Sequence, residues 1–138
     1  MSYRSLSPAT GEVEFSRKIL TYYAKNGERF LVPVALHPVI GQAHTENSPI
    51  GGLFAVEPWT FPYYQFARRA GPHLMAGNVL MFKPAGNVPQ CAIGFEQLWT
   101  QAGAPAGFYA NLRISSAEAP AFAAVARTSP KSLEILGE

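Results

Sequence analysis

The sequence has one cysteine and few charged residues for its length. A single cysteine among 138 residues excludes a disulfide framework and a thiolate zinc site within the chain. The formal net charge of +2 is too small to indicate a nucleic-acid partner. Hydrophobic residues make up 48% of the chain and charged residues 14%, which excludes wholesale disorder. So low a charged fraction predicts that much of the chain is buried, in a larger body or against a partner.

Long apolar runs are also missing. No run approaches the roughly 20 residues that span a bilayer. The N-terminal segment carries Arg4, Glu12 and Glu14 and lacks the apolar stretch of a secretory signal. We therefore expect a cytoplasmic protein without membrane partners, of a length that fits one domain.

Turn-forming residues are frequent in the first third of the chain. Glycine and proline number 12 each, so long uninterrupted helices are not expected. Residues 1–16 are predicted to be extended, with a hairpin at the turn S-P-A-T-G-E of residues 7–12. Apolar spacing predicts a helix over 17–31. The prolines of residues 32–49 favour two short strands at a sheet edge.

From residue 50 onward, short apolar runs alternate with helical patterns. This order, with short connections, predicts right-handed crossovers and a parallel sheet. The expected fold class is α/β, with a partial Rossmann-like parallel sheet and flanking helices. The expected strands cover residues 50–56, 78–82, 108–114 and 132–136, and the expected helices cover 63–76, 87–102 and 119–126.

Three details refine these helices. Pro72 is expected to kink or shorten the first. Asn87 and Gln90 have the spacing of a capping box at the start of the second, with Pro89 in its first turn. Gly103 is a natural stop for that helix.

Few residues have the spacing of a catalytic or metal site. The histidines at 37, 44 and 73 share no helix face with each other, and they are interpreted as surface or loop residues. Cys91 falls within a helix near its apolar face and has no indicated base, which favours a packed thiol over a nucleophile. Neither standard phosphate-binding loop occurs. Spacing alone therefore predicts no function.

Four strings of residues are more informative. They are E-P-W-T-F-P at 57–62, G-P-H-L-M-A-G-N-V at 71–79, F-K-P-A at 82–85 and A-G-A-P-A-G at 102–107. Their order and spacing resemble the cofactor domain of the aldehyde dehydrogenase superfamily, which has P-W-N-F-P, A-P-A-L-x-x-G-N, K-P-A and E-A-G-x-P-x-G. The resemblance is closest to the succinate-semialdehyde dehydrogenase-like branch, and S-P-A-T-G-E resembles that branch's N-P-A-T-G-E.

The resemblance implies NAD(P)-dependent oxidation of an aldehyde, such as succinic semialdehyde, to the carboxylic acid. In that family a cysteine thiolate attacks the aldehyde, and the asparagine of P-W-N-F-P helps to hold the oxyanion. Thr60 occupies this asparagine position here, and its hydroxyl is one donor on a shorter arm. Loss of one such donor typically costs about 10²–10³ in rate.

The resemblance also implies a set of cofactor residues. Lys83, within the matching string K-P-A that Pro84 and Ala85 complete, corresponds to the lysine that binds the adenosine ribose. Gly86 stands where strict NAD users have glutamate, so either NAD or NADP is compatible. Trp59 corresponds to a residue at the nicotinamide end, although core packing explains it equally well. Gly103 and Pro105 match the edge of the adenine pocket, although a turn requires the same residues.

The departures from the family are as informative. The chain resembles only the N-terminal cofactor part, so we expect an N-terminal hairpin, helix and edge strands over 1–49 and a partial dinucleotide-binding α/β domain over 50–138. Long helices expected after residues 7–12 are missing, Pro120 replaces a glycine, and the nucleophilic-cysteine segment is absent. L-E-I-L-G at 133–137 is a weak echo of the family's general-base string.

These departures predict that the chain alone is catalytically incompetent. Three hypotheses stay open: an aldehyde dehydrogenase family protein, a non-catalytic nucleotide- or partner-binding remnant that docks on a full-length relative, and the product of a degraded or split gene. Missing helices would also leave a bare sheet face or an unpaired edge, which predicts self-association.

Overall fold

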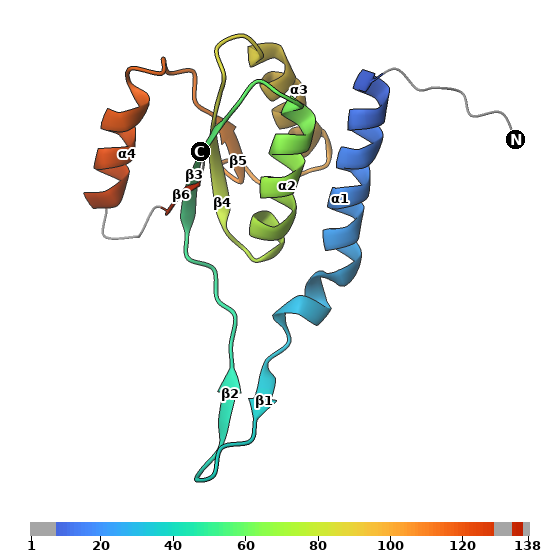
Figure 1. Cartoon of the computed structure of the whole chain (residues 1–138), viewed down its shortest axis with the longest axis vertical. Coiled ribbons are helices and arrows are strands. Elements are labelled where there is room, and N and C mark those ends of the chain that lie inside the picture. The colour runs from blue at the N-terminus through green and yellow to red at the C-terminus, as the bar shows by residue number, and fades with distance from the viewer. Residues whose placement is uncertain (1–7, 129–133, 137–138) are drawn as a thin grey trace, which may run out of the picture.

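Helices and strands alternate along most of the chain (Figure 1). The computed structural model describes residues 8–128 and 134–136. The helices in these residues are α1 (Pro8–Leu31), α2 (Pro62–Met75), α3 (Pro89–Gln101) and α4 (Ala119–Thr128). The strands are β1 (Val34–Leu36), β2 (Ala43–Thr45), β3 (Gly52–Glu57), β4 (Val79–Pro84), β5 (Tyr109–Asn111) and β6 (Glu134–Leu136).

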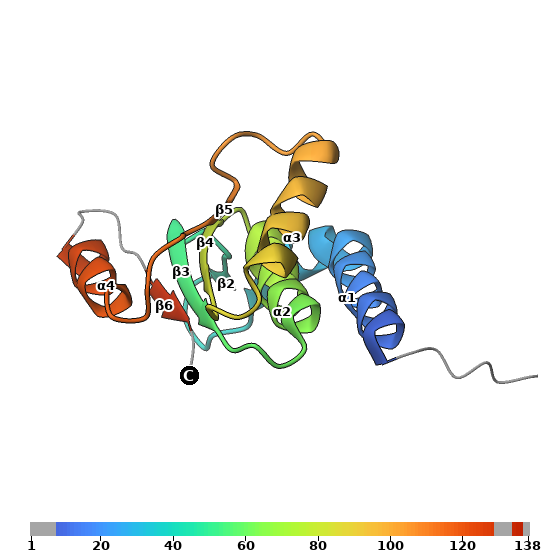
Figure 2. The same ribbon diagram turned by 90° about the horizontal axis from the view of Figure 1, so that it is seen from above.

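A parallel sheet with strand order β5-β4-β3-β6 lies at the centre. Helices α2 and α3 cover one face, with α1 outside them, and α4 covers the other (Figure 2). The chain runs outward from β3 to β4 and β5, then returns to place β6 on the other side of β3. This is the order of the first four strands of a dinucleotide-binding fold. The parallel sheet and the fold class predicted from the sequence are confirmed.

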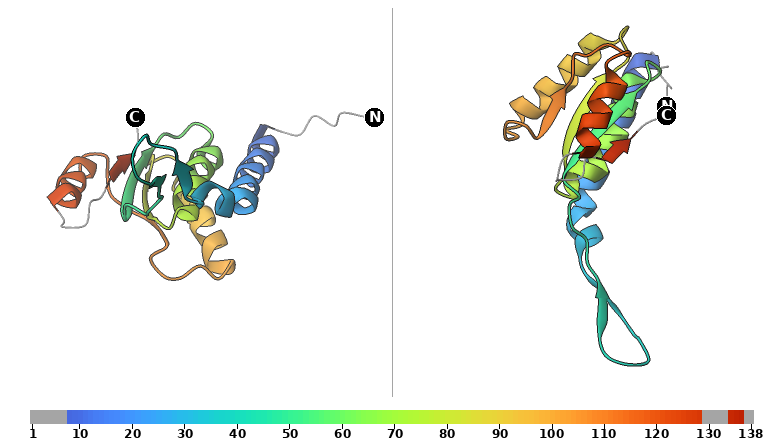
Figure 3. Two further views of the ribbon diagram at one scale, coloured as in Figure 1. Left: turned by 90° about the horizontal axis from the view of Figure 1, so that it is seen from below. Right: turned by 90° about the vertical axis from the view of Figure 1, so that its left-hand side faces the viewer.

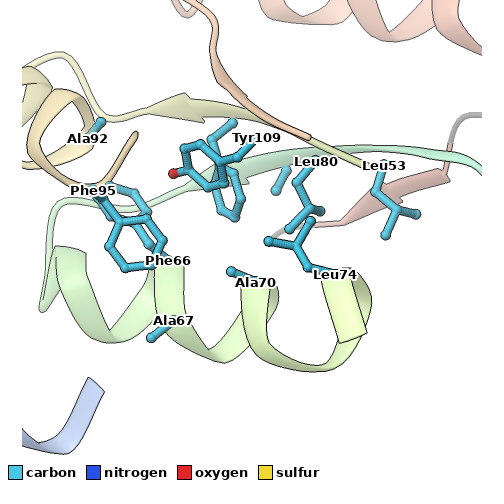
Figure 4. Close-up of a cluster of buried hydrophobic side chains, with 11 residues drawn as sticks. Leu53, Phe66, Ala67, Ala70, Leu74, Leu80, Ala92, Phe95 and Tyr109 are labelled. Atoms are coloured by element: carbon cyan, nitrogen blue, oxygen red, sulfur yellow. The ribbon is translucent and has the colours of Figure 1, made fainter. Parts of the chain in front are cut away.

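An aromatic cluster joins the sheet to α2 and α3. Alternation along β4 directs Leu80 and Phe82 to this face, and both are fully buried. The ring of Phe66 in α2 lies 5.6 Å from that of Phe82 and 5.5 Å from that of Phe95 in α3. Figure 4 shows Phe66 and Phe95 gathered with Tyr109 of β5 between the helices and the sheet. The cluster fixes both helices onto the same face.

The opposite face is covered as well. Phe54 of β3 is fully buried, and its ring lies 4.9 Å from the ring of Phe122 in α4. The expected bare sheet face is therefore wrong for β3. That expectation assumed that the helices covering the sheet were missing. Instead, α4 covers the face opposite α2 and α3, and α1 adds an outer layer beyond α2 and α3.

Helix α1 begins at Pro8, so the hairpin and turn predicted over residues 1–16 are wrong from residue 8 onward. Two glycines let α1 and α2 approach closely. A Cβ at Gly27 would lie 2.7 Å from Met75 Cγ, and one at Gly71 would lie 2.7 Å from Tyr23 Cδ2. Packing against α2 outweighs the local turn preference of residues 8–12. The part of the prediction that falls on residues 1–7 lies outside the described residues.

Strands β1 and β2 form an antiparallel pair that projects from the body (Figures 1 and 3). Two short strands were expected here, at a sheet edge. They pair instead only with each other, because the chain leaves the body after α1 and returns to begin β3. Val39 and Ile40, at the end of this arm, are almost fully exposed.

Helix ends differ in detail from the sequence prediction. Pro72 does not end α2, which continues to Met75 because the Ala76 amide donates to the Pro72 carbonyl in a closing turn. Asn87 is not the N-cap of α3. The Val88 amide donates to the Ala85 carbonyl, and this turn moves the N-cap to Val88, without a side-chain hydrogen bond.

The strand expected over 108–114 is shorter in the structure, where β5 ends at Asn111. The predicted end of α3 before Gly103 agrees with the positive φ of 81° at that glycine.

A buried ion pair ties the end of β3 to α2. Glu57 is only 3% exposed, and its Oε1 accepts a hydrogen bond of 2.9 Å from Arg69 Nε. Burial raises the pKa of the Glu57 carboxyl, and the hydrogen bond and charge of Arg69 oppose that effect without cancelling it. The pair fixes where the chain leaves the sheet and enters the next loop.

We predict that Glu57 makes stability depend on pH. Because the folded-state pKa lies above the ordinary value of 4.5, the stabilising contribution is fully present at lower pH and is lost as pH rises through the folded-state pKa. The unfolding free energy of the native chain relative to Glu57→Gln should therefore fall as pH rises. Urea unfolding of both chains, from about pH 4 to 7, measures this difference.

The matched variant is Arg69→Met, which removes the cation that lowers the Glu57 pKa. It should extend the fall in unfolding free energy to higher pH. A pH-independent difference between the native chain and Glu57→Gln would contradict the prediction.

Candidate functional site

The carboxyl ends of three neighbouring strands meet at one edge of the sheet, at the top of Figure 1. The connections that leave this edge are residues 58–61 after β3, 85–88 after β4 and 112–118 after β5. Ligands of open parallel sheets bind beyond this edge. A ligand site of this chain is therefore expected at this edge.

Lys83 lies near the end of β4, and the residue is 4% exposed. Since Phe82 points toward α2 and α3, alternation directs Lys83 to the α4 face. Its Nζ donates a hydrogen bond of 3.0 Å to Ser116 Oγ, in the connection between β5 and α4. A buried ammonium group is thus held at the carboxyl edge by a hydroxyl from the adjacent connection.

Ser116 is itself held in place by its neighbours. The Ser115 amide donates to Glu118 Oε2 at 2.7 Å, and the Glu118 amide donates to Ser115 Oγ at 3.3 Å. This is a capping box, and the hydrogen bond from Ser115 lowers the pKa of Glu118. The spacing S-x-x-E at residues 115–118 is the sequence signal that marks this support for Ser116.

The turn after β4 leaves open space. Pro84 and Ala85 lead into the turn closed by the Val88 amide, and a Cβ at Gly86 would meet no atom within 4 Å. Pro84 also lines a cavity of about 330 Å³ with Asn111 of β5. The residue after Ala85 therefore has room for a larger side chain or for a ligand.

The loop after β3 presents two aromatic rings to solvent. Trp59 is 60% exposed and Phe61 61% exposed, and Thr60 between them is also exposed. Phe61 has φ 50° and ψ 60°, a left-handed conformation that is unusual for a bulky residue. This loop follows β3, and Lys83 lies near the end of the adjacent strand β4. Both are therefore at the same edge of the sheet.

Glu12 of α1 supports this loop from outside the sheet. Its Oε1 accepts hydrogen bonds from the Tyr63 amide at 2.6 Å and the Tyr64 amide at 3.1 Å. Both amides belong to the first turn of α2. No local sequence signal marks this role, since Glu12 is 51 positions from Tyr63.

Gly103 and Pro105 do not join the site. They lie in the connection between α3 and β5, which approaches the opposite edge of the sheet, where the Leu80 amide at the start of β4 donates to the Phe108 carbonyl. The structure therefore separates them from Lys83. Gly103, with φ 81°, lies in the turn that follows α3, as the alternative interpretation of this residue as a turn residue required.

Cys91 and the histidines also lie elsewhere. Cys91 is the third residue of α3. It packs against the core on the face of the sheet opposite Lys83. Burial and the neighbouring Cys91 raise the pKa of Tyr63, so the thiol has a phenol beside it.

Across residues 8–128 and 134–136, no three histidine, cysteine, aspartate or glutamate side chains are grouped closely enough to hold a metal ion. Within the same residues, no helix has the length and apolarity to cross a membrane.

Comparison with known proteins gives several curated relatives that are succinate-semialdehyde dehydrogenases, among them the following two. The succinate-semialdehyde dehydrogenase [NADP(+)] of Deinococcus radiodurans is 40% identical over 113 residues, covering 82% of this chain and 24% of the relative. Succinate-semialdehyde dehydrogenase [NADP(+)] 1 of Mycobacterium ulcerans is 40% identical over 116 residues, with 82% and 25% covered. The chain thus spans about a quarter of the length of these relatives.

Solved structures and a family model agree with these relatives. The succinic semialdehyde dehydrogenase from Streptococcus pyogenes, solved in complex with NADP+, superposes with a TM-score of 0.83 at 36% identity, covering 91% of this chain and 27% of that one. The family model described as "Aldehyde dehydrogenase family" matches residues 4–127. This chain therefore belongs to the aldehyde dehydrogenase family.

Proposed function

We propose that this chain provides the part of an aldehyde dehydrogenase that binds the adenosine half of a nicotinamide dinucleotide. The enzyme would oxidise a small aldehyde such as succinic semialdehyde to the acid. One observation carries the proposal: the buried ammonium of Lys83 is fixed at the carboxyl edge of the sheet by Ser116. The bound dinucleotide supplies the hydride acceptor for such an oxidation.

The donors of Lys83 fit an adenosine ribose. An ammonium group has three N–H donors, and one of them is used by Ser116 Oγ. The other two can reach hydroxyl or phosphate oxygens brought to this edge. Fixing the amine in advance lowers the entropy lost when a ligand binds.

Gly86 favours acceptance of NADP. A glutamate at this position would hold the ribose hydroxyls of NAD and repel the 2′-phosphate of NADP. Here no carboxylate is present and the space is open. The curated relatives named for NADP(+) support the same preference.

Trp59 and Thr60 are proposed to serve the reacting end. Trp59 would line the nicotinamide side, and the Thr60 hydroxyl would stand in for the asparagine amide that holds the oxyanion. Thr60 also favours a second candidate, a non-catalytic dinucleotide- or partner-binding role. Its single donor on a short arm would lower the rate by about 10²–10³ relative to asparagine. Cys91, on the other side of the sheet, is assigned to packing.

We predict that dinucleotide binding is weak and depends on Lys83. The chain holds mainly the adenosine side, so calorimetry with AMP, NAD and NADP should give dissociation constants from the high micromolar range to about 1 mM, or about 4–5 kcal/mol. Lys83→Met should weaken binding at least about tenfold, because it removes charge-assisted hydrogen bonds.

Lys25→Met is the control, since it removes an exposed charge on α1 and keeps the same net charge as Lys83→Met. It should bind as the native chain does. Unaltered NADP affinity in Lys83→Met would contradict the proposal.

We further predict that Gly86 sets the choice between NADP and NAD. Gly86→Glu places a carboxylate in open space, so the fold should tolerate it. Repulsion of the 2′-phosphate should lower the ratio of NADP to NAD affinity at least about tenfold. Gly86→Gln has the same shape without the charge and should leave the ratio near that of the native chain. An equal loss in both variants would show a steric effect instead.

Self-association stays a prediction, and the arm formed by β1 and β2 is the surface that supports it. Its end exposes Val39 and Ile40, and large apolar side chains in such positions favour a protein partner. We expect the chain to elute above its 15.0 kDa monomer mass in light scattering coupled to size exclusion. The double variant Val39→Ser and Ile40→Ser should shift it toward the monomer, whereas Val13→Ser on α1 should not. A monodisperse native monomer would contradict this expectation.

A further inference from the structure

We propose that Glu12 is a positioning residue for the loop of residues 58–61. Its role in binding and catalysis rests on the proposed function, which assigns Trp59 and Thr60 of this loop to the reacting end. The geometry itself is independent of that assignment. Glu12 lies on α1, in the outermost helical layer, and reaches across to the first turn of α2.

Helix α2 lacks an N-terminal cap of its own. The N-cap residue Phe61 makes no side-chain cap hydrogen bond, and the first turn contains no acidic residue. Pro62 has no N–H to donate. The Tyr63 and Tyr64 amides are then the first donors of the helix, and both bind Glu12 Oε1 at 2.6 and 3.1 Å. One carboxylate from another helix thus performs the task of an N-cap and complements the positive end of the helix dipole.

The loop that enters this turn is strained. Phe61 is the one non-glycine residue with a positive φ in the described part of the chain. A conformation of this kind is strained for a bulky residue and persists only when its surroundings fix it. The exposed rings of Trp59 and Phe61 gain little from packing, so the constraint has to act through the backbone.

Hydrogen bonds from Gln65 to two backbone carbonyls hold the loop where it enters α2. The Gln65 amide donates to the Phe61 carbonyl at 3.0 Å, and Gln65 Nε2 donates to the Thr60 carbonyl at 3.4 Å. Both bonds require that the first turn of α2 be in place. Glu12 fixes that turn, so its removal should let Phe61 relax and move Trp59 and Thr60 relative to Lys83.

The test uses the full chain labelled with 5-fluorotryptophan. The sequence has two tryptophans, and Trp59→Phe assigns their fluorine resonances. Glu12→Ala should shift or broaden the Trp59 resonance while leaving Trp99, which packs against Phe95, unchanged. Glu12→Gln keeps an accepting oxygen and should reduce that shift at least by half. A purely global loss of stability would not move one tryptophan selectively.

Glu14→Ala is the matched control. Glu14 lies on the same helix and pairs with Arg17 of that helix at 3.0 Å. It should leave both resonances in place. An unchanged Trp59 resonance in Glu12→Ala overturns the proposal, as does an equal shift in Glu12→Gln.

Hydrogen exchange of the native chain gives a test that needs no variant. First-turn amides have no acceptor within their own helix. The Tyr63 and Tyr64 amides should nevertheless be protected, because Glu12 accepts from both. Exchange at the rate of an unstructured peptide would overturn the proposal even if Glu12→Ala failed to fold.

Ligand binding separates this inference from the proposed function. Glu12→Ala should leave AMP affinity unchanged and lower NADP affinity at least twofold, because only NADP extends to Trp59. If the native chain bound no dinucleotide, the proposed function would fail, while the fluorine and exchange measurements would still decide the role of Glu12.

Discussion

The burial of Phe82 against Phe66, whose ring also meets that of Phe95, is the contact on which the rest of the structure depends. It joins the central strand to both helices of one face. Because side chains alternate along a strand, burying Phe82 on that face sends Lys83 to the other. The amine then meets Ser116 before α4. One hydrophobic contact therefore both stabilises the core and aims the residue proposed to bind the cofactor.

Two carboxylates determine the course of the loop between β3 and α2. Glu57 is buried at the end of the strand, where desolvation raises its pKa and Arg69 compensates in part. Glu12 holds the first turn of α2 from a different helix. Between these points the chain accepts a left-handed Phe61 and exposes two rings. Such a loop is stabilised by its ends rather than by its own packing, as is common where side chains are presented to a ligand.

The cofactor side and the reacting side of the site differ in how well they fit the family. On the proposed function, Lys83, Ser116 and the open space at Gly86 would anchor an adenosine ribose with or without a 2′-phosphate. Thr60, in contrast, departs from the family's asparagine. The chain spans about a quarter of the length of its curated relatives. The boundary predicted between residues 49 and 50 stays a prediction.

The sequence by itself determined the alternating elements from residue 50 onward, the parallel sheet, the family and the place of Lys83, because these follow from local periodicity and contiguous strings. Only the tertiary structure decided that residues 8–16 are helical, that β1 and β2 form a separate arm, that Gly103 and Pro105 face the opposite edge, and that Glu12 caps α2. The physical reason is the same in each case. Turn propensities are worth little per residue, whereas contacts between segments far apart in the chain, such as Gly27 with Met75, set the final conformation and leave no local trace.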